Sequence, residues 1–112
     1  MDPNSLKNGD LKYSLSVQIS VAFFKKALDH FENKDYLKCL ISLDSAIKYN
    51  FFNSTYYIFK ALVLGVFIGR YNYAIEEVEK ALILDPHSEN VNKLKKELLR
   101  LQFNNDVCNY YI

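Results

Sequence analysis

Few side chains of this 112-residue chain have the types and spacing that catalysis or metal binding needs. The two histidines, His30 and His87, lie far apart in the sequence and in no metal-ligand spacing, so we expect surface roles for both. Cys39 and Cys108 do not form a Cys-x-x-Cys pair, which leaves zinc binding and thioredoxin-like chemistry without support. The chain has three glycines and no glycine-rich phosphate loop. We therefore predict that the protein is not an enzyme and holds neither a metal nor a cofactor.

Charged residues form two clusters, and we interpret both as solvated helix faces. The acidic cluster Glu76, Glu77 and Glu79 would need a pocket to act as paired catalytic carboxylates, and nothing in the sequence indicates one. The basic cluster could contact phosphate, but Glu89 and Glu97 interrupt it. It consists of Lys93, Lys95, Lys96 and Arg100. The net charge is only +1, so nucleic acid is an unlikely partner and nothing global points to a membrane surface.

The start of the chain and its cysteines indicate the compartment. Met1 opens directly onto a polar stretch, which argues against a signal peptide. The most apolar stretch, residues 56–68, is too short to span a bilayer, which needs about 20 residues. Cys39 falls on an apolar helical stripe, where a buried, reduced thiol is favoured over a disulfide with Cys108. We expect a cytoplasmic, intracellular protein with no membrane partner.

Residues 56–86 form the stretch around which the chain is organised, and they predict two helices folded back on each other. The first helix, residues 56–68, is apolar nearly all round with Lys60 as its only charge, so it must be covered on more than one side. Gly69 supplies a left-handed residue for the turn. Apolar residues then recur at helical spacing from Tyr71 onward, until Pro86 ends the second helix.

The run GRYNYAIEEVEKALILDP resembles the second half of a tetratricopeptide repeat. That family has glycine and an aromatic residue at the turn, two small residues in the second helix and a closing proline. Here these places are filled by Gly69, Tyr71, Ala74, Ala81 and Pro86. The resemblance is strongest over residues 55–88. The family's small residue before the turn would fall at Leu62, whereas Ala61 lies one residue earlier, so we interpret the difference as a one-residue insertion in the first helix.

A degenerate first copy of the repeat covers residues 20–53. Cys39 aligns with Ala74, and Ala46 with Ala81, each pair 35 residues apart, which is the usual 34 plus the inserted residue. A pentatricopeptide repeat also has a period of 35, but the ending of the second copy resembles the tetratricopeptide kind. Lys34 stands where the family has glycine, so we expect Asn33 to supply the left-handed turn residue instead.

The two ends of the chain are harder to assign. Strict alternation of apolar and polar residues over residues 11–21 is typical of a strand, but a competing helical pattern begins at Val17. We favour a helix over residues 16–32 after a flexible or extended leader, residues 1–15. Near the other end, Ser88 can cap a closing helix over residues 89–103, which a short repeat array needs to cover its open end. We expect Asn104 to Asp106 to break that helix, leaving residues 104–112 as a short apolar tail.

We therefore predict an all-α protein of about five helices: two tetratricopeptide-like hairpins plus a closing helix, of the α-solenoid type. The resemblance implies that the first helix of each repeat lines a concave groove where peptides or partner helices bind. The residues of that face are Phe24, Lys25, Leu28, Phe31, Tyr56, Phe59, Lys60, Val63 and Phe67.

The function we expect is that of a non-catalytic adaptor, or of a small subunit of a larger assembly, with another protein as its partner. Two alternatives stay open. One is a self-associating scaffold, in which two copies form a homodimer. The other is an RNA-associated protein that uses the basic closing helix. Steep weakening of binding by salt would favour the RNA alternative.

Overall fold

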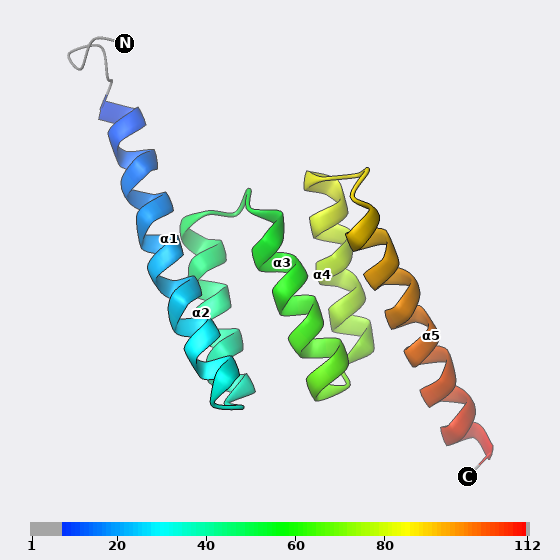
Figure 1. Cartoon of the computed structure of the whole chain (residues 1–112). Helices are drawn as coiled ribbons and strands as arrows, with labels where there is room; N and C mark the ends of the chain where they lie inside the picture. The colour runs from blue at the N-terminus through cyan, green and yellow to red at the C-terminus, as the bar shows by residue number, and fades with distance from the viewer. Residues whose placement is uncertain (1–7, 112) are drawn as a thin grey trace. The chain divides into compact units, whose positions relative to one another are not determined.

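A computed structural model describes residues 8–111, and the side chains of residues 15–107. Within that part of the chain there are five α-helices, one π-helical turn and no strand, so the predicted all-α class is confirmed (Figure 1). The elements are α1 (Asn8–Glu32), α2 (Tyr36–Tyr49), α3 (Ser54–Leu62), η2 (Val63–Ile68), α4 (Tyr71–Leu84) and α5 (Glu89–Tyr111). They belong to two compact units, Met1–Phe51 and Phe52–Ile112.

The first unit is the hairpin of α1 and α2, whose buried core includes two small residues and one thiol. Ala27, Cys39, Leu43 and Ala46 are fully buried, and the burial of Cys39 is as predicted. Asp35 caps α2, since its carboxylate accepts a hydrogen bond from the Lys38 backbone N–H at 3.2 Å. The cap fixes the start of α2 directly after the turn.

The turn between α1 and α2 is built around Lys34, not around Asn33 as predicted. Lys34 has φ = 60°, and it is the one non-glycine residue with positive φ in the described chain. Its N–H donates to the Phe31 carbonyl, and the Asp35 N–H donates to the His30 carbonyl at 2.8 Å. These two hydrogen bonds define a Schellman motif with Lys34 in the left-handed place, where glycine is usual. Lys34 thus adopts the conformation that Gly69, 35 residues later, adopts with φ = 83°.

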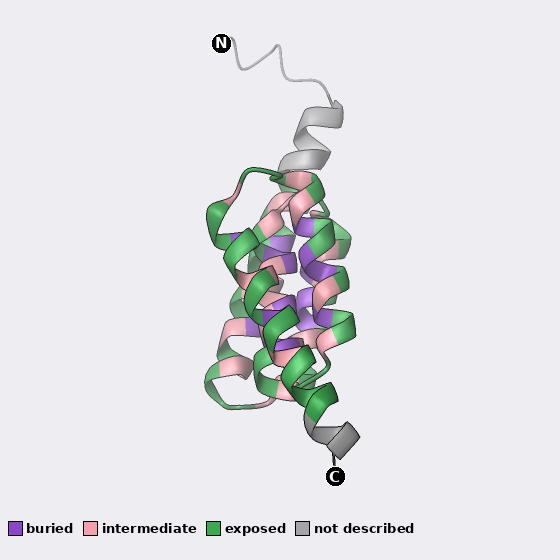
Figure 2. Ribbon diagram, turned by 90° about the vertical axis from the view of Figure 1, so that its right-hand side faces the viewer, coloured by how far each residue is buried: buried purple, intermediate pink, exposed green. Residues whose placement is uncertain are grey.

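The second unit contains α3, η2, α4 and α5, and its buried residues face one another between the helices (Figure 2). Asn53 caps α3, accepting from the Thr55 N–H at 3.0 Å, and Ser88 caps α5 as predicted, accepting from the Val91 N–H at 3.3 Å. The fully or nearly fully buried apolar residues are Tyr56, Ala61, Val63, Ala74, Val78, Ala81, Val91 and Leu98. Ala74 and Ala81 are therefore core residues, as their spacing indicated.

The π-helical turn η2 continues α3 without a break and ends at Gly69, whose N–H donates to the Leu64 carbonyl. A π-helix closes its hydrogen bonds over five residues instead of four, so it holds an extra residue without rotating the helix that follows. This is the form that the expected one-residue insertion would take. Gly65 lies in this turn, and a Cβ atom there would come within 2.3 Å of Leu98 Cδ2 and 3.1 Å of Ala74 Cβ. Gly65 thus lies where η2 approaches Ala74 of α4 and Leu98 of α5 too closely for a side chain.

Both terminal helices are longer than predicted. Residues 11–15 are helical within α1, so the prediction of an extended segment there is wrong. Asn104 to Asp106 continue α5 toward Tyr111, so the predicted break and the separate tail are also wrong. Residues 1–7 of the predicted leader, and Ile112, lie outside the described residues. Among the described helices, none combines the length and the apolar character that crossing a membrane requires.

Candidate partner-binding surface

Four of the predicted partner-binding residues lie on α1, in the first unit. Phe24, Leu28 and Phe31 recur at spacings of four and three, so they share one face of the helix, and all three are half-buried. Lys25 is exposed beside them. The Phe31 ring centroid lies 6.0 Å from that of Tyr36, at the start of α2. This face of α1 therefore contributes to the hairpin core and also leaves part of its apolar surface accessible.

The other five predicted residues lie on α3 and η2, in the second unit, and they do not share one environment. Tyr56 is only 2% exposed and Val63 is fully buried. Their burial argues against both as contacts for a partner, because a buried side chain reaches a partner only if the unit opens. Phe59 is half-buried, and Phe67 is 44% exposed. Phe67 thus offers the largest accessible ring of the predicted set.

Val66 belongs to the accessible surface of η2, although its sequence position gave no reason to choose it. It is 48% exposed beside Phe67. A regular α-helix over this stretch would have turned successive residues by about 100° each. Because η2 is a π-helical turn, the faces assigned to residues after Val63 by α-helical spacing are shifted. The one-residue offset of Ala61 was the signal that could have warned of this shift.

Lys60 is the predicted residue with the most specific contact. Its Nζ lies 3.4 Å from Oε1 of Glu77, and Lys80 Nζ lies 3.0 Å from the same oxygen. Glu77 is only 5% exposed, so the interpretation of all three glutamates as solvent-facing is wrong for this one. The other oxygen, Oε2, is buried and accepts no hydrogen bond from the described residues. The two lysines pair with one oxygen of this buried carboxylate, and the contact from Lys60 links α3 to α4.

Tyr57 lies close enough to this charge cluster to be affected by it. Burial raises the pKa of the Tyr57 phenol; Lys80 and Lys60 lower it, and Glu77 raises it. The phenol therefore stays protonated at neutral pH. The cluster of Tyr57, Lys60, Glu77 and Lys80 is closed to solvent around its carboxylate, and this arrangement links α3 to α4 without presenting a general base to a substrate.

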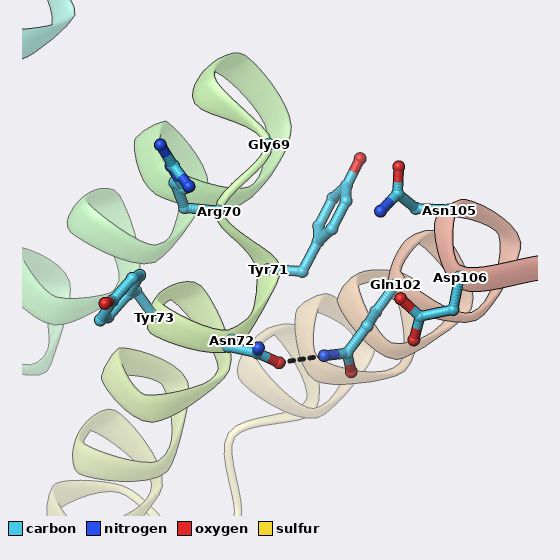
Figure 3. A pocket seen from close by; sticks show the side chains of 8 residues that line it. All are labelled: Gly69, Arg70, Tyr71, Asn72, Tyr73, Gln102, Asn105 and Asp106. Atoms are coloured by element: carbon cyan, nitrogen blue, oxygen red, sulfur yellow. Dashed lines mark hydrogen bonds between the residues drawn. The ribbon is translucent and has the colours of Figure 1, made fainter. Parts of the chain in front are cut away.

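A small pocket lies in the second unit, between the turn before α4 and the second half of α5 (Figure 3). Its volume is about 170 Å³. Gln102 donates a hydrogen bond to Asn72 across it, and the Tyr71 ring extends toward Asn105. Its lining consists of Gly69, Arg70, Tyr71, Asn72, Tyr73, Gln102, Asn105 and Asp106. Amides and tyrosines dominate, with one charge of each sign and no histidine or cysteine, so the pocket has no recognisable catalytic set.

Two further observations bear on metal and nucleic acid. Within the part of the chain that the structure describes, no three histidine, cysteine, aspartate or glutamate side chains are grouped so that they could hold a metal ion. On α5, Lys95 pairs with Glu79 at 2.6 Å and Arg100 pairs with Glu97. Half of the basic cluster is thereby bound to carboxylates, which lowers its attraction for phosphate.

An aromatic stack on the first unit was not foreseen from the sequence. The rings of Phe23 and Tyr49 lie parallel, with centroids 5.8 Å apart and an interplanar angle of 8°. Lys26 lies over the Phe23 ring and Lys48 over the Tyr49 ring, at 5.6 Å and 6.0 Å from the centroids. The stack joins α1 to the end of α2. Phe23 does not share the helix face defined by the spacing of Val17 and Phe24, so the periodicity of apolar residues did not predict its role.

No model of a known protein family matches the chain, and no curated protein matches it either. The functional interpretation therefore depends on the residues and the geometry described above.

Proposed function

We propose that the protein is a non-catalytic adaptor or a small subunit of a larger assembly, which binds a segment of another protein on the apolar surface of α3 and η2. The observation that carries this proposal is the exposure of Val66 and Phe67, at 48% and 44%, on a helix whose other large apolar residues are mostly covered. Exposed aromatic residues are enriched among the anchors of protein interfaces. Phe59, on α3, is half-buried and is the other predicted aromatic ring of this helix that is not fully covered.

The tetratricopeptide assignment is part of this proposal, and three features support it. Lys34 and Gly69, 35 residues apart, both adopt the left-handed conformation directly before a second helix. Cys39 and Ala74 are both fully buried, and so are Ala46 and Ala81, at the places where the family has small residues. In that family the first helix of each repeat faces the partner. The half-buried residues Phe24, Leu28 and Phe31 of α1 are then the corresponding surface of the first unit.

Chemistry favours an apolar segment over an acidic one as the partner. Lys60 is already held by Glu77, and its side chain is 20% exposed, so little of its charge is available to attract a partner. A partner helix or peptide that buries one or two apolar side chains against Val66 and Phe67 would gain most of its affinity there.

Alanine variants of Phe67 and Phe59 test the proposal. Tagged full-length protein would be used to enrich partners from an extract of its source cells, with cross-linking and quantitative mass spectrometry. We expect Phe67→Ala to lower the recovery of the true partner at least about tenfold, because an interface anchor contributes about 2 kcal/mol or more. Its thermal stability should change little, since the ring is largely wet in the free protein.

Ile83→Ala is the matched control, because Ile83 is a 79% exposed apolar residue on α4. It should leave partner recovery unchanged. Phe59→Ala separates binding from folding: a core ring costs about 3–5 kcal/mol of folding stability when truncated. The proposal fails if wild-type protein recovers no partner in larger amounts than Phe67→Ala does. If Phe67→Ala unfolds the protein, the ring belongs to the core and the α1 surface becomes the one to test, with Phe24→Ala.

A further inference from the structure

The pocket between the start of α4 and the second half of α5 is lined by polar side chains that come from two separate elements (Figure 3). Residues 69–73 line it on one side, and Gln102, Asn105 and Asp106 line it on the other. Its volume is about 170 Å³, whereas sites for drug-sized ligands have roughly 300–1,000 Å³. The pocket therefore suits one small polar molecule or one side chain.

The lining of this pocket includes an unpaired charge of each sign. Arg70 and Asp106 are both exposed, and neither forms an ion pair with another described residue. The neighbouring cations of α5, Lys95 and Arg100, are by contrast both paired with glutamates. Figure 3 shows the Arg70 and Asp106 side chains on opposite sides of the Tyr71 ring. A ligand that meets both charges must carry a negative group at one end and a positive group at the other.

The polar groups around Asp106 favour a planar cation at that end of the pocket. Asp106 offers two carboxylate oxygens, and Gln102 and Asn105 offer amide oxygens from the same helix. The Tyr71 ring extends toward Asn105 from the other wall (Figure 3). A guanidinium is planar, donates through five N–H groups and stacks on aromatic rings, so it matches this combination better than a compact ammonium does. At the other end, Arg70 can bind a carboxylate through two parallel hydrogen bonds.

We propose that this pocket binds arginine with a free α-carboxylate, with the guanidinium of the ligand at Asp106 and its carboxylate at Arg70. The ligand is the free amino acid or the carboxyl-terminal residue of another chain, since both present the same two groups. The site is independent of the partner surface proposed above, because neither Val66 nor Phe67 lines the pocket. Loss of either site would leave the other intact.

Titration of full-length protein with L-arginine tests the proposal, with binding followed by calorimetry and by the NMR shifts of backbone amides. We expect saturable binding, with the largest shifts at Gly69, Asn72 and Asn105. L-Citrulline has nearly the shape of arginine without the side-chain charge, and agmatine lacks the carboxylate. Each should bind at least about tenfold more weakly, because one charge-assisted interaction is lost.

N-acetyl-L-arginine distinguishes the two sources of the ligand, because it keeps the carboxylate and the guanidinium but has an amide in place of the α-ammonium. Binding equal to that of L-arginine would show that the carboxyl-terminal residue of a chain fits the pocket. Much weaker binding would show that the free amino acid is the ligand. Both outcomes keep the guanidinium at Asp106 and the carboxylate at Arg70.

Two neutralising variants assign the two ends of the ligand. Asp106→Asn should weaken L-arginine at least about tenfold and leave L-citrulline unchanged. Arg70→Gln should weaken L-arginine to a similar extent and leave agmatine unchanged. Both side chains are exposed, so thermal unfolding of both variants should match wild type. Asp85→Asn and Lys93→Gln make the same charge changes outside the pocket lining and should leave arginine binding unchanged.

Three results would each overturn the proposal. One is the absence of saturable L-arginine binding at millimolar concentration. Another is binding of L-citrulline or agmatine as tight as that of L-arginine. The third is wild-type affinity for L-arginine in Asp106→Asn or in Arg70→Gln.

Discussion

At the scale of single residues, burial decides how Cys39 behaves. The side chain is fully buried in the first unit and forms no disulfide. Burial disfavours the charged thiolate and raises the pKa of Cys39 to about 11, from an ordinary value of 9.0. Since the thiolate is the reactive form, Cys39 is a structural residue of the hairpin core and not a nucleophile.

We predict that Cys39 is labelled slowly by thiol reagents in native protein and rapidly after unfolding. A Cys108→Ser background reports Cys39 alone, and the labelling rate can be followed by mass spectrometry.

The raised pKa of Cys39 also makes the free energy of unfolding depend on pH. Below about pH 9 both states carry the thiol and its contribution is complete; it is lost as the pH rises through about 11, because the unfolded chain ionises first.

Urea unfolding at several alkaline pH values, compared with Cys39→Ala in the same background, measures that loss. The stability difference between the two proteins should shrink as the pH rises. Native labelling as fast as that of a free cysteine would contradict the burial.

The same scale shows which residue environments could be predicted from the sequence. Cys39, Ala46, Ala74 and Ala81 are buried as their spacing indicated, because small residues at helical spacing allow two helices to approach closely. Glu77 could not be predicted. It stands in a charged stretch with Glu76 and Glu79, which are exposed, and it is paired with Lys60, which reaches it from another helix. Local periodicity carries no information about such a pairing.

At the scale of elements, the ends of α2 and α4 could be predicted from the sequence, whereas those of the terminal helices α1 and α5 could not. α2 and α4 each begin two residues after a left-handed turn residue, Lys34 and Gly69, and α4 ends just before Pro86. α1 has 25 residues, whereas its hairpin partner α2 has 14. The part of α1 that extends beyond α2 does not need a single apolar face. The alternation of apolar and polar residues there is therefore compatible with a helix and did not indicate a strand. In α5, Asn104 to Asp106 cost only a few tenths of a kcal/mol each, which neither breaks a helix nor ends it.

We predict that η2 tolerates the deletion of one residue. Removing Val66, which is exposed, should convert the π-helical turn into α-helix and leave Gly69 at the end of the same helix. Thermal unfolding should show that most of the stability is retained.

Deletion of Glu76 from α4 is the matched control, since Glu76 is also exposed. There the deletion would rotate Val78 and Ala81 out of the core by about 100° and unfold the unit. Equal damage from the two deletions would mean that η2 is not the site of an insertion.

At the scale of the whole molecule, the chain consists of two compact units that meet in sequence at Phe51 and Phe52. Both phenylalanines are exposed, at 56% and 60%, in the short segment between α2 and α3. Exposed loops are the preferred sites of proteolytic cleavage, because a protease must bind its substrate in an extended form.

We predict that chymotrypsin cleaves native protein first at Phe51 or Phe52. Phe103 is 67% exposed as well, but it lies within α5 and should resist cleavage while the helix is intact. Mass spectrometry of the early fragments identifies the site, and a variant with serine at positions 51 and 52 should survive longer. First cleavage at Phe103 would show that α5 opens more readily than the inter-unit segment.

The π-helical turn η2 has a consequence for how the gene can change. One inserted codon in most helices would alter every later position, and selection would remove it. In η2 the effect of the added residue is confined to six residues, Val63–Ile68, before Gly69 ends the helix. A single insertion or deletion mutation can therefore add or remove that codon without disrupting the fold. Related chains can therefore differ by one residue here while α4 and α5 keep their packing.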